Sequence, residues 1–183
     1  MDDEVIKRVL TEISEVLGQI EETSIFKAVD LIAGSDRIFV TGAGRSGLCM
    51  RAFSQRLMHL GKQVHVLGET TTPSAQLGDL LIIGSGSGKT KGLMAIAEKA
   101  IGIGVNILLI TTSLNSPMAA MTANKIIIPA PSLNPESEHT SIQPMGTLFE
   151  QSLFVLCDCI ILGLMELLDV DEDDMRRRHG NLE

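Results

Sequence analysis

The sequence predicts an α/β protein: a single doubly wound, flavodoxin-like sheet of five parallel strands in the order 2-1-3-4-5, with helices on both faces. Five short aliphatic segments alternate with helical patterns, and the four aliphatic residues at 80–83 are typical of a strand buried on both faces. The first and third segments run directly into glycine- and serine-rich loops. In this strand order the two loops flank the point where the order reverses, so we expect them to border one crevice.

The elements follow one another along one domain of 183 residues, a length that suits a single core. We expect two N-terminal helices in residues 1–34, alternating strands and helices in 35–130, a polar loop and candidate lid at 131–143, a long apolar helix at 144–168 and a tail at 169–183. Strands are predicted at 37–41, 63–67, 80–83, 105–111 and 125–129. Local patterns predict helix N-caps at Ser24, at Ser116 before a short helix to about Ala123, and at Thr147.

Composition and charge exclude several classes of function. The net charge of −8, with one basic run at 176–178, argues against nucleic-acid binding. The best apolar run, residues 153–168, is shorter than the ~20 residues of a membrane span and contains two acidic residues. Cys49, Cys157 and Cys159 have neither metal-ligand spacing nor a disulfide framework. We therefore expect buried, reduced thiols and no metal in a cytoplasmic protein without a nucleic-acid or membrane partner.

The loop from Gly84 to Thr90 has the features of an anion-binding site. Its glycines alternate with Ser85 and Ser87, so backbone N–H groups can turn toward a ligand, and the helix that follows directs its positive end to the same place. A nucleotide P-loop would need glycine at position 83, where the chain has Ile83. The structural alternative is a plain turn between strand and helix, which rarely needs three alternating glycines.

The first loop, Gly42-Ala43-Gly44-Arg45-Ser46-Gly47, matches the pattern G-x-G-x-x-G after a strand and before a helix. Glu69, after the second strand, supplies the acidic residue of a dinucleotide site. Against this interpretation, Arg45 and Ser46 put a cation and a hydroxyl at the turn, and no residues remain for the substrate domain of a dehydrogenase. Dinucleotide binding stays open as an alternative to phosphate binding.

Six segments together resemble a known family: residues 42–47, 56–61, 68–74, 85–88, 144–150 and the C-terminal Arg178-His179 with Asn181-Leu182. With these segments the chain resembles the sugar isomerase (SIS) domain family over essentially its whole length, and within it the 6-phospho-3-hexuloisomerases. The resemblance implies interconversion of D-arabino-3-hexulose 6-phosphate and fructose 6-phosphate without a metal or organic cofactor, as in formaldehyde assimilation by the ribulose monophosphate pathway. It also implies a homo-oligomer, usually a tetramer.

The resemblance also implies roles for individual residues. Glu150 is the base that moves a proton between neighbouring carbons, although Thr147-Leu148-Phe149-Glu150 is also a capping-box pattern. His59 and His179 are candidates for a second acid/base, and either can come from a neighbouring subunit. The expected substrate-binding residues are Ser46, Ser85, Gly86, Ser87, Gly88, Lys89 and Thr90.

A non-catalytic module that binds phosphosugars is a second function compatible with such a domain. Sensors of this kind commonly join the domain to a DNA-binding helix-turn-helix, which we do not expect here because the sequence lacks a basic face. Glu150 also has no evident purpose in a sensor. The enzyme is therefore the favoured interpretation.

Overall fold

The centre of the molecule is a parallel five-stranded sheet with the strand order β2-β1-β3-β4-β5. The structure is a computed structural model that describes residues 3–131 and 141–182. The strands are β1 (Arg37–Gly42), β2 (Gln63–Val66), β3 (Leu80–Gly84), β4 (Asn106–Thr111) and β5 (Asn124–Ile127). The doubly wound sheet and its strand order are confirmed, and the predicted strand limits hold to within two residues.

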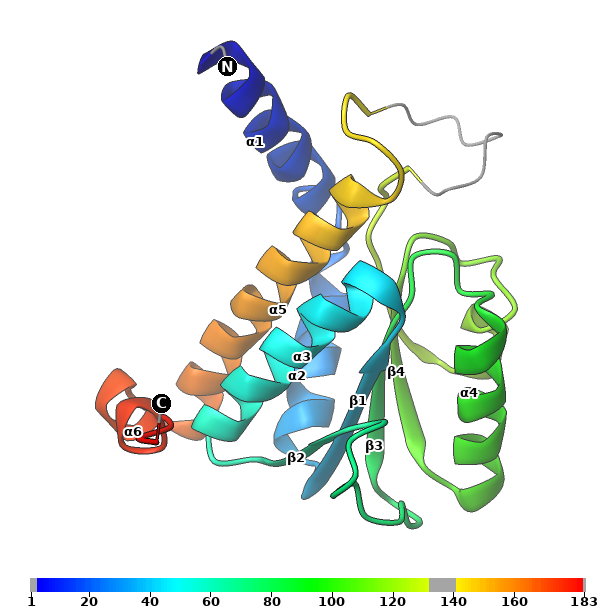
Figure 1. Ribbon diagram of the computed structural model, residues 1–183, viewed down its shortest axis with the longest axis vertical. Coiled ribbons are helices and arrows are strands. Elements are labelled where there is room, and N and C mark those ends of the chain that lie inside the picture. The colour runs from blue at the N-terminus through cyan, green and yellow to red at the C-terminus, as the bar shows by residue number, and fades with distance from the viewer. Residues whose placement is uncertain (1–2, 132–140, 183) are drawn as a thin grey trace.

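Helices cover both faces of this sheet (Figure 1). They are α1 (Asp3–Leu17), α2 (Glu22–Ala33), α3 (Gly44–His59), α4 (Lys91–Ile103), α5 (Thr147–Leu168) and α6 (Glu172–Arg177), with a 3₁₀ turn η1 (Ala119–Met121). Side chains alternate along each strand, so Ile38 and Val40 pack with α2, α3 and α5 on one face. Phe39 and Leu81 pack with α4 and η1 on the other. The chain thus passes to opposite faces after β1 and β3, as the predicted switch point requires.

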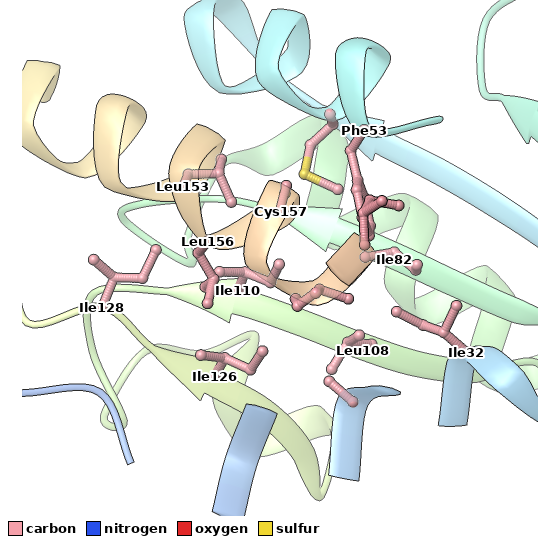
Figure 2. Close-up of a cluster of buried hydrophobic side chains, with 14 of the residues drawn as sticks. Ile32, Phe53, Ile82, Leu108, Ile110, Ile126, Ile128, Leu153, Leu156 and Cys157 are labelled. Carbon is pink, nitrogen blue, oxygen red and sulfur yellow. The ribbon is translucent and has the colours of Figure 1, made fainter. Parts of the chain in front are cut away.

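The larger core lies between the sheet and helix α5. Figure 2 shows Leu153 and Leu156 of α5 close to Ile110 of β4, and all three are at most 1% exposed. Because this core contains only aliphatic, sulfur and phenylalanine side chains, it depends on close packing. Truncating a buried leucine such as Leu153 to alanine typically costs about 2–5 kcal/mol of stability.

Helix α5 has 22 residues and is long and apolar enough, by length and composition alone, to cross a membrane. The apolar run at 153–168 in the sequence is shorter than this helix. The helix begins earlier, at Thr147, and its first turn includes the charged Glu150. One side of α5 supplies buried residues to the core, from Leu148 to Leu164. We therefore identify it as the core helix of the fold, as in many proteins with a buried central helix.

Two of the three predicted helix caps are wrong, and the third precedes a shorter element than predicted. Helix α2 begins before Ser24, whose hydroxyl donates to the Glu21 carbonyl at 2.6 Å, and the residue at the N-cap position is Glu21. Ser116 accepts a hydrogen bond from the Ala119 N–H at 3.2 Å, as the predicted cap requires, but the element that follows is the 3₁₀ turn η1 and not a helix to Ala123. The N-cap of α5 is Gly146, and Thr147 donates to the Pro144 carbonyl at 2.7 Å. At Ser24 and Thr147 a backbone carbonyl three residues earlier competes with the local capping pattern.

The cysteines and the candidate lid also differ from expectation or lie outside the described residues. Cys157 is buried, but Cys159 is exposed on the outer side of α5, and Cys49 is half-buried. The prediction that all three thiols are buried is therefore wrong for Cys159. Most of the predicted lid, including His139, falls in residues 132–140, which are outside the described residues.

The segment that leads into α5 is held by helix α1, which extends beyond the body of the molecule (Figure 1). The Glu12 carboxylate accepts hydrogen bonds from the Ile142 N–H and the Ser141 hydroxyl at 2.8 Å, and from the Gln143 amide at 3.1 Å. Burial acts to raise the pKa of Glu12, but these hydrogen bonds and the charge of Arg8 outweigh burial and lower it. An ionised carboxylate therefore fixes the approach to the first turn of α5.

Candidate active site

A pocket of about 320 Å³ opens at the carboxyl ends of β1 and β3, at the predicted switch point. It is bordered by the starts of three helices: α3 at Gly44, α4 at its N-cap Thr90, and α5 at its N-cap Gly146. The N-terminus of a helix carries unpaired N–H groups and a partial positive charge. Three such ends around one pocket favour an anionic ligand in a protein whose net charge is −8.

Five of the seven predicted substrate-binding residues line this pocket: Ser46, Ser85, Gly86, Ser87 and Thr90. Thr90 occupies the N-cap position of α4, but its hydroxyl makes no capping hydrogen bond. That hydroxyl is therefore available to a ligand at the same place as the helix N-terminus. The prediction that the first and third strand loops face one pocket is supported by this arrangement.

Gly88 and Lys89 do not line the pocket. The Lys89 side chain is exposed. Gly88 is buried behind the loop with φ of +57°, and a Cβ there would collide with the Ser116 side chain. Both observations assign Gly88 to the shape of the loop, because only glycine adopts this conformation in so small a space.

The glycine pattern of the first loop has a packing explanation. A Cβ on Gly47, in the first turn of α3, would lie 2.7 Å from the Gly42 carbonyl oxygen at the end of β1. The strand end and the helix therefore touch through their backbones. This close approach brings Arg45 and Ser46 to the rim of the pocket.

Glu150 lies in the first turn of α5, and its carboxylate forms an ion pair with Arg45. The exposed fraction is 17% for the Glu150 side chain and 64% for Arg45, so the carboxylate is the more enclosed partner. The predicted capping box is not formed, because Gly146 is the N-cap and the carboxylate points to α3 instead. The structure therefore does not support a helix-capping role for Glu150, and its carboxylate lines the pocket.

Arg45 is the residue that sequence reasoning left out of the site. The position of Arg45 beside Ser46 in the first loop already indicated that it lies near the ligand. Its ion-pair partner, Glu150, could not be inferred from the neighbouring residues. Cys49, one turn further along α3, donates from its thiol to the Glu150 carbonyl oxygen at 3.3 Å. Burial, followed by the charge of Glu150, raises the pKa of Cys49, so this thiol is a packing group and not an ionised nucleophile.

Comparison with known proteins agrees with this site. The model of the SIS domain family matches residues 31–155. The chain belongs to the SIS domain family. It is 40% identical to the 3-hexulose-6-phosphate isomerase of Mycobacterium gastri, over 94% of this chain and 86% of that protein. It is 39% identical to the protein of the same name from Bacillus subtilis (strain 168), over 98% of both chains.

A solved structure is similar to this SIS domain over almost its whole length. It is a hypothetical protein from Methanococcus jannaschii whose crystal structure was reported to infer a molecular function of 3-hexulose-6-phosphate isomerase. The two share 34% identity with a TM-score of 0.85, and the match covers 98% of this chain and 99% of the other. The resemblance that the sequence motifs indicated is therefore confirmed.

The two candidate histidines lie together, but at the other end of the SIS domain. His59 ends α3 and is buried, and its ring stacks on that of His179 with centroids 5.2 Å apart. Arg178 holds this arrangement by donating to the His59 carbonyl at 3.1 Å. Helix α3 begins at the pocket, and at 1.5 Å per residue its length separates His59 from the pocket by roughly 20 Å. Within one chain neither histidine reaches Glu150.

The polar side chains of this SIS domain indicate the kind of ligand that the pocket suits. Among residues 3–131 and 141–182, no group of three or more histidine, cysteine, aspartate or glutamate side chains is placed to hold a metal ion. The polar groups at the pocket are instead hydroxyls, backbone N–H groups, one guanidinium and one carboxylate. Such a set suits a phosphorylated ligand with an adjacent site for proton transfer.

Proposed function

We propose that this SIS domain is a 3-hexulose-6-phosphate isomerase, also called 6-phospho-3-hexuloisomerase. It interconverts D-arabino-3-hexulose 6-phosphate and fructose 6-phosphate. The observation that carries the proposal is the Glu150 carboxylate, held by Arg45 beside a pocket bordered by three helix N-termini. Relatives at 39–40% identity that bear this name, matched along nearly the whole chain, support the same substrate.

The reaction moves a carbonyl group between two adjacent carbons. Glu150 removes the proton from C2 of the 3-ketose, and the electrons form an enediolate across C2 and C3. The protonated Glu150 returns the proton to C3, while a proton passes from O2 to O3. The product carries its carbonyl at C2, so nothing is gained or lost and no redox cofactor is required. A positioned general base of this kind contributes about 10²–10⁴ to the rate.

The phosphate of the substrate binds at the 85–90 loop. Ser85, Ser87 and Thr90 supply hydroxyls, and the loop and the start of α4 supply backbone N–H groups. Ser46 approaches from the start of α3 on the other side of the pocket. With the phosphate fixed at one end, the sugar carbons extend toward Glu150 at the start of α5.

Arg45 stabilises the charge that develops during the reaction. Its guanidinium lines the pocket and contacts the base directly. When the enediolate forms, the negative charge leaves Glu150 and appears on the substrate oxygens. A fixed cation next to both positions lowers the energy of the transition state without moving.

A neighbouring copy of the chain supplies the second acid/base. Helix α5 is highly apolar, yet only 39% of its most apolar 18-residue stretch is buried within the chain. Phe154, Val155 and Leu162 are exposed on α5, and Leu48 and Met58 on α3. We propose that a second copy covers these residues through a two-fold axis, in a homo-oligomer. An antiparallel packing of this kind brings His59 and His179 of one chain toward the Glu150 end of the other.

Turnover of the 3-ketose tests the proposed function. Purified protein is mixed with D-arabino-3-hexulose 6-phosphate, and the carbonyl carbons are followed by ¹³C NMR. We expect the C3 carbonyl signal to fall as fructose 6-phosphate appears, and the reverse reaction to reach the same equilibrium. A folded, oligomeric protein that binds the substrate without converting it would overturn the isomerase and favour the phosphosugar-binding module.

A further inference from the structure

The carbonyl group of Gly86 is held by an unusual number of donors. It accepts hydrogen bonds from the Thr111 hydroxyl at 3.0 Å, from the Thr112 hydroxyl at 2.8 Å and from the Thr112 N–H at 3.1 Å. A carbonyl oxygen has two lone pairs, so three donors saturate it. The donors belong to Thr111, the last residue of β4, and to Thr112 directly after it; β4 is the strand next to β3 in the sheet.

A second carbonyl of the same loop is held from the same direction. The Gly88 carbonyl accepts a hydrogen bond from the Met118 N–H at 3.0 Å, in the segment that follows β4. No peptide bond in residues 3–131 and 141–182 is cis, so each carbonyl points away from the N–H of the same peptide plane. The Ser87 N–H is therefore turned away from the threonines. Ser87 itself lines the pocket.

The orientation of the Gly86 peptide matters because it decides which end of its dipole faces a phosphate. Glycine rotates between conformations at little cost, so a loop with glycine at alternate positions does not fix its peptides by itself. A peptide turned the other way would present a carbonyl oxygen to the anion and repel it. Loops that bind anions through successive N–H groups need these groups to converge.

We propose that Thr111 and Thr112 are positioning residues that preset the 85–90 loop for the substrate phosphate. Their hydroxyls hold the Gly86 carbonyl on the β4 side of the loop and thereby direct the Ser87 N–H to the opposite side, at a residue that lines the pocket. This inference rests on the proposed function, which assigns the phosphate to this loop. Thr111 is fully buried and does not line the pocket, so it acts only through Gly86.

The decisive variant is Thr111→Val, because valine has the same shape but lacks the hydroxyl. Thr112→Val is the second variant; Thr112 lines the pocket, so this change also removes a group that faces the ligand. Isothermal titration with inorganic phosphate and steady-state kinetics are measured for each variant. We expect Thr111→Val to weaken phosphate binding and raise KM, with a smaller change in kcat because Glu150 is untouched. Thr111→Ser, which restores a hydroxyl, should recover both.

Thr122→Val is the matched control. The Thr122 hydroxyl also donates to a backbone carbonyl, that of Ile107 at 2.7 Å, but at the opposite end of β4. Its loss should lower the thermal stability and leave phosphate affinity and KM unchanged. If Thr111→Val and Thr122→Val lose stability alike and both bind phosphate as the wild type does, the positioning role is wrong. If the wild-type protein does not bind phosphate and Ser87→Ala leaves KM unchanged, the phosphate site of the proposed function fails.

Discussion

Arg45 and Glu150 lie 105 positions apart in the sequence, and their contact decides how the site is interpreted. Family resemblance predicted Glu150 as the base, whereas the local pattern predicted a helix cap. Local patterns cannot settle this choice, because the competing partner comes from another helix. The glycine- and serine-rich loops were predictable, since the residues that bind an anion are adjacent in the chain. Gly88 and Lys89 were the exceptions, because Gly88 forms the turn of the loop behind the pocket and leaves the Lys89 side chain exposed.

Glu150→Gln tests the base. The substitution keeps the shape of the side chain but removes the proton acceptor, so kcat should fall by about 10²–10⁴ while KM changes little. Stability should change by about 1 kcal/mol or less, because Arg45 is largely exposed. The matched control is Glu69→Gln, since Glu69 forms a similar exposed pair with Arg51 away from the pocket. If Glu150→Gln had a normal kcat and a lowered stability, Glu150 would be a structural residue and not the base.

Arg45→Gln tests the stabilising cation. Losing a preorganised charge next to the enediolate should lower kcat by about 10²-fold. Arg45→Lys retains the charge but not the planar fork, so its kcat should be intermediate. Arg51→Gln provides the control, because it breaks the Arg51–Glu69 pair and should leave kcat unchanged. A rise in KM without a change in kcat would show that Arg45 binds the substrate and takes no part in the chemical step.

At the scale of elements, the strands were predicted well and the helix ends poorly. Four consecutive aliphatic residues have few alternatives to a strand buried on both faces, as β3 shows. Helix ends depend on which carbonyl or carboxylate competes for a hydroxyl. The hydroxyls of Ser24 and Thr147 each donate to a backbone carbonyl three residues earlier. The contact between Glu12 and residues 141–143 was likewise invisible, because it joins segments about 130 residues apart.

The amino ends of β1 and β3 are joined by a pair that gives stability a pH dependence. The Asp79 carboxylate accepts hydrogen bonds from Arg37 at 3.0 and 2.6 Å and from the Gln76 N–H at 2.7 Å. Burial acts to raise the pKa of Asp79, but Arg37 and the Gln76 N–H outweigh burial and lower it below 3.8. Such a carboxylate stabilises the fold above its unfolded pKa and loses that contribution as the pH falls through its lowered folded pKa.

Asp79→Asn should therefore lower the free energy of unfolding by about 2–4 kcal/mol at neutral pH. The difference between wild type and variant should be constant at neutral pH. It should begin to shrink near pH 3.8, where the carboxyl group of the unfolded chain takes up its proton, and should be lost once the pH falls below the lowered pKa of the folded state. Urea unfolding at a series of pH values measures this difference. Asp36→Asn is the control. Asp36 directly precedes β1, at the same amino end of the sheet, and the ion pairs in the described residues do not include it. A difference that is unchanged well below pH 3.8 would contradict the account.

At the scale of the whole molecule, the sheet order and the family were predictable from the sequence. Whether one chain brings all the candidate catalytic residues together was not. The pattern of strands and loops determines where the pocket opens. It does not show that His59 and His179 lie at the far end of α3, because the length and direction of that helix decide their distance from Glu150. The exposed apolar side of α5 gives the physical reason to expect a second copy.

Leu162→Lys tests that expectation. Leu162 is 65% exposed on α5, so a lysine there leaves the fold of one chain intact but puts a charge into the proposed contact. We expect light scattering to show a smaller assembly and the activity to fall in proportion, with the thermal unfolding of the remaining chain still cooperative. Leu77→Lys is the control, because Leu77 is 82% exposed in the loop before β3. A monomer with full activity would exclude the shared site and leave Glu150 as base.

The central claim is that Glu150 transfers a proton between C2 and C3 of a sugar phosphate, and solvent exchange measures this directly. Fructose 6-phosphate is incubated with the protein in ²H₂O, and the C3 proton is followed by NMR. We predict that deuterium accumulates at C3 with the wild-type protein and with Glu69→Gln, and that Glu150→Gln slows this exchange by about 10²-fold or more. Binding of fructose 6-phosphate without any exchange, or exchange at the wild-type rate in Glu150→Gln, would contradict it.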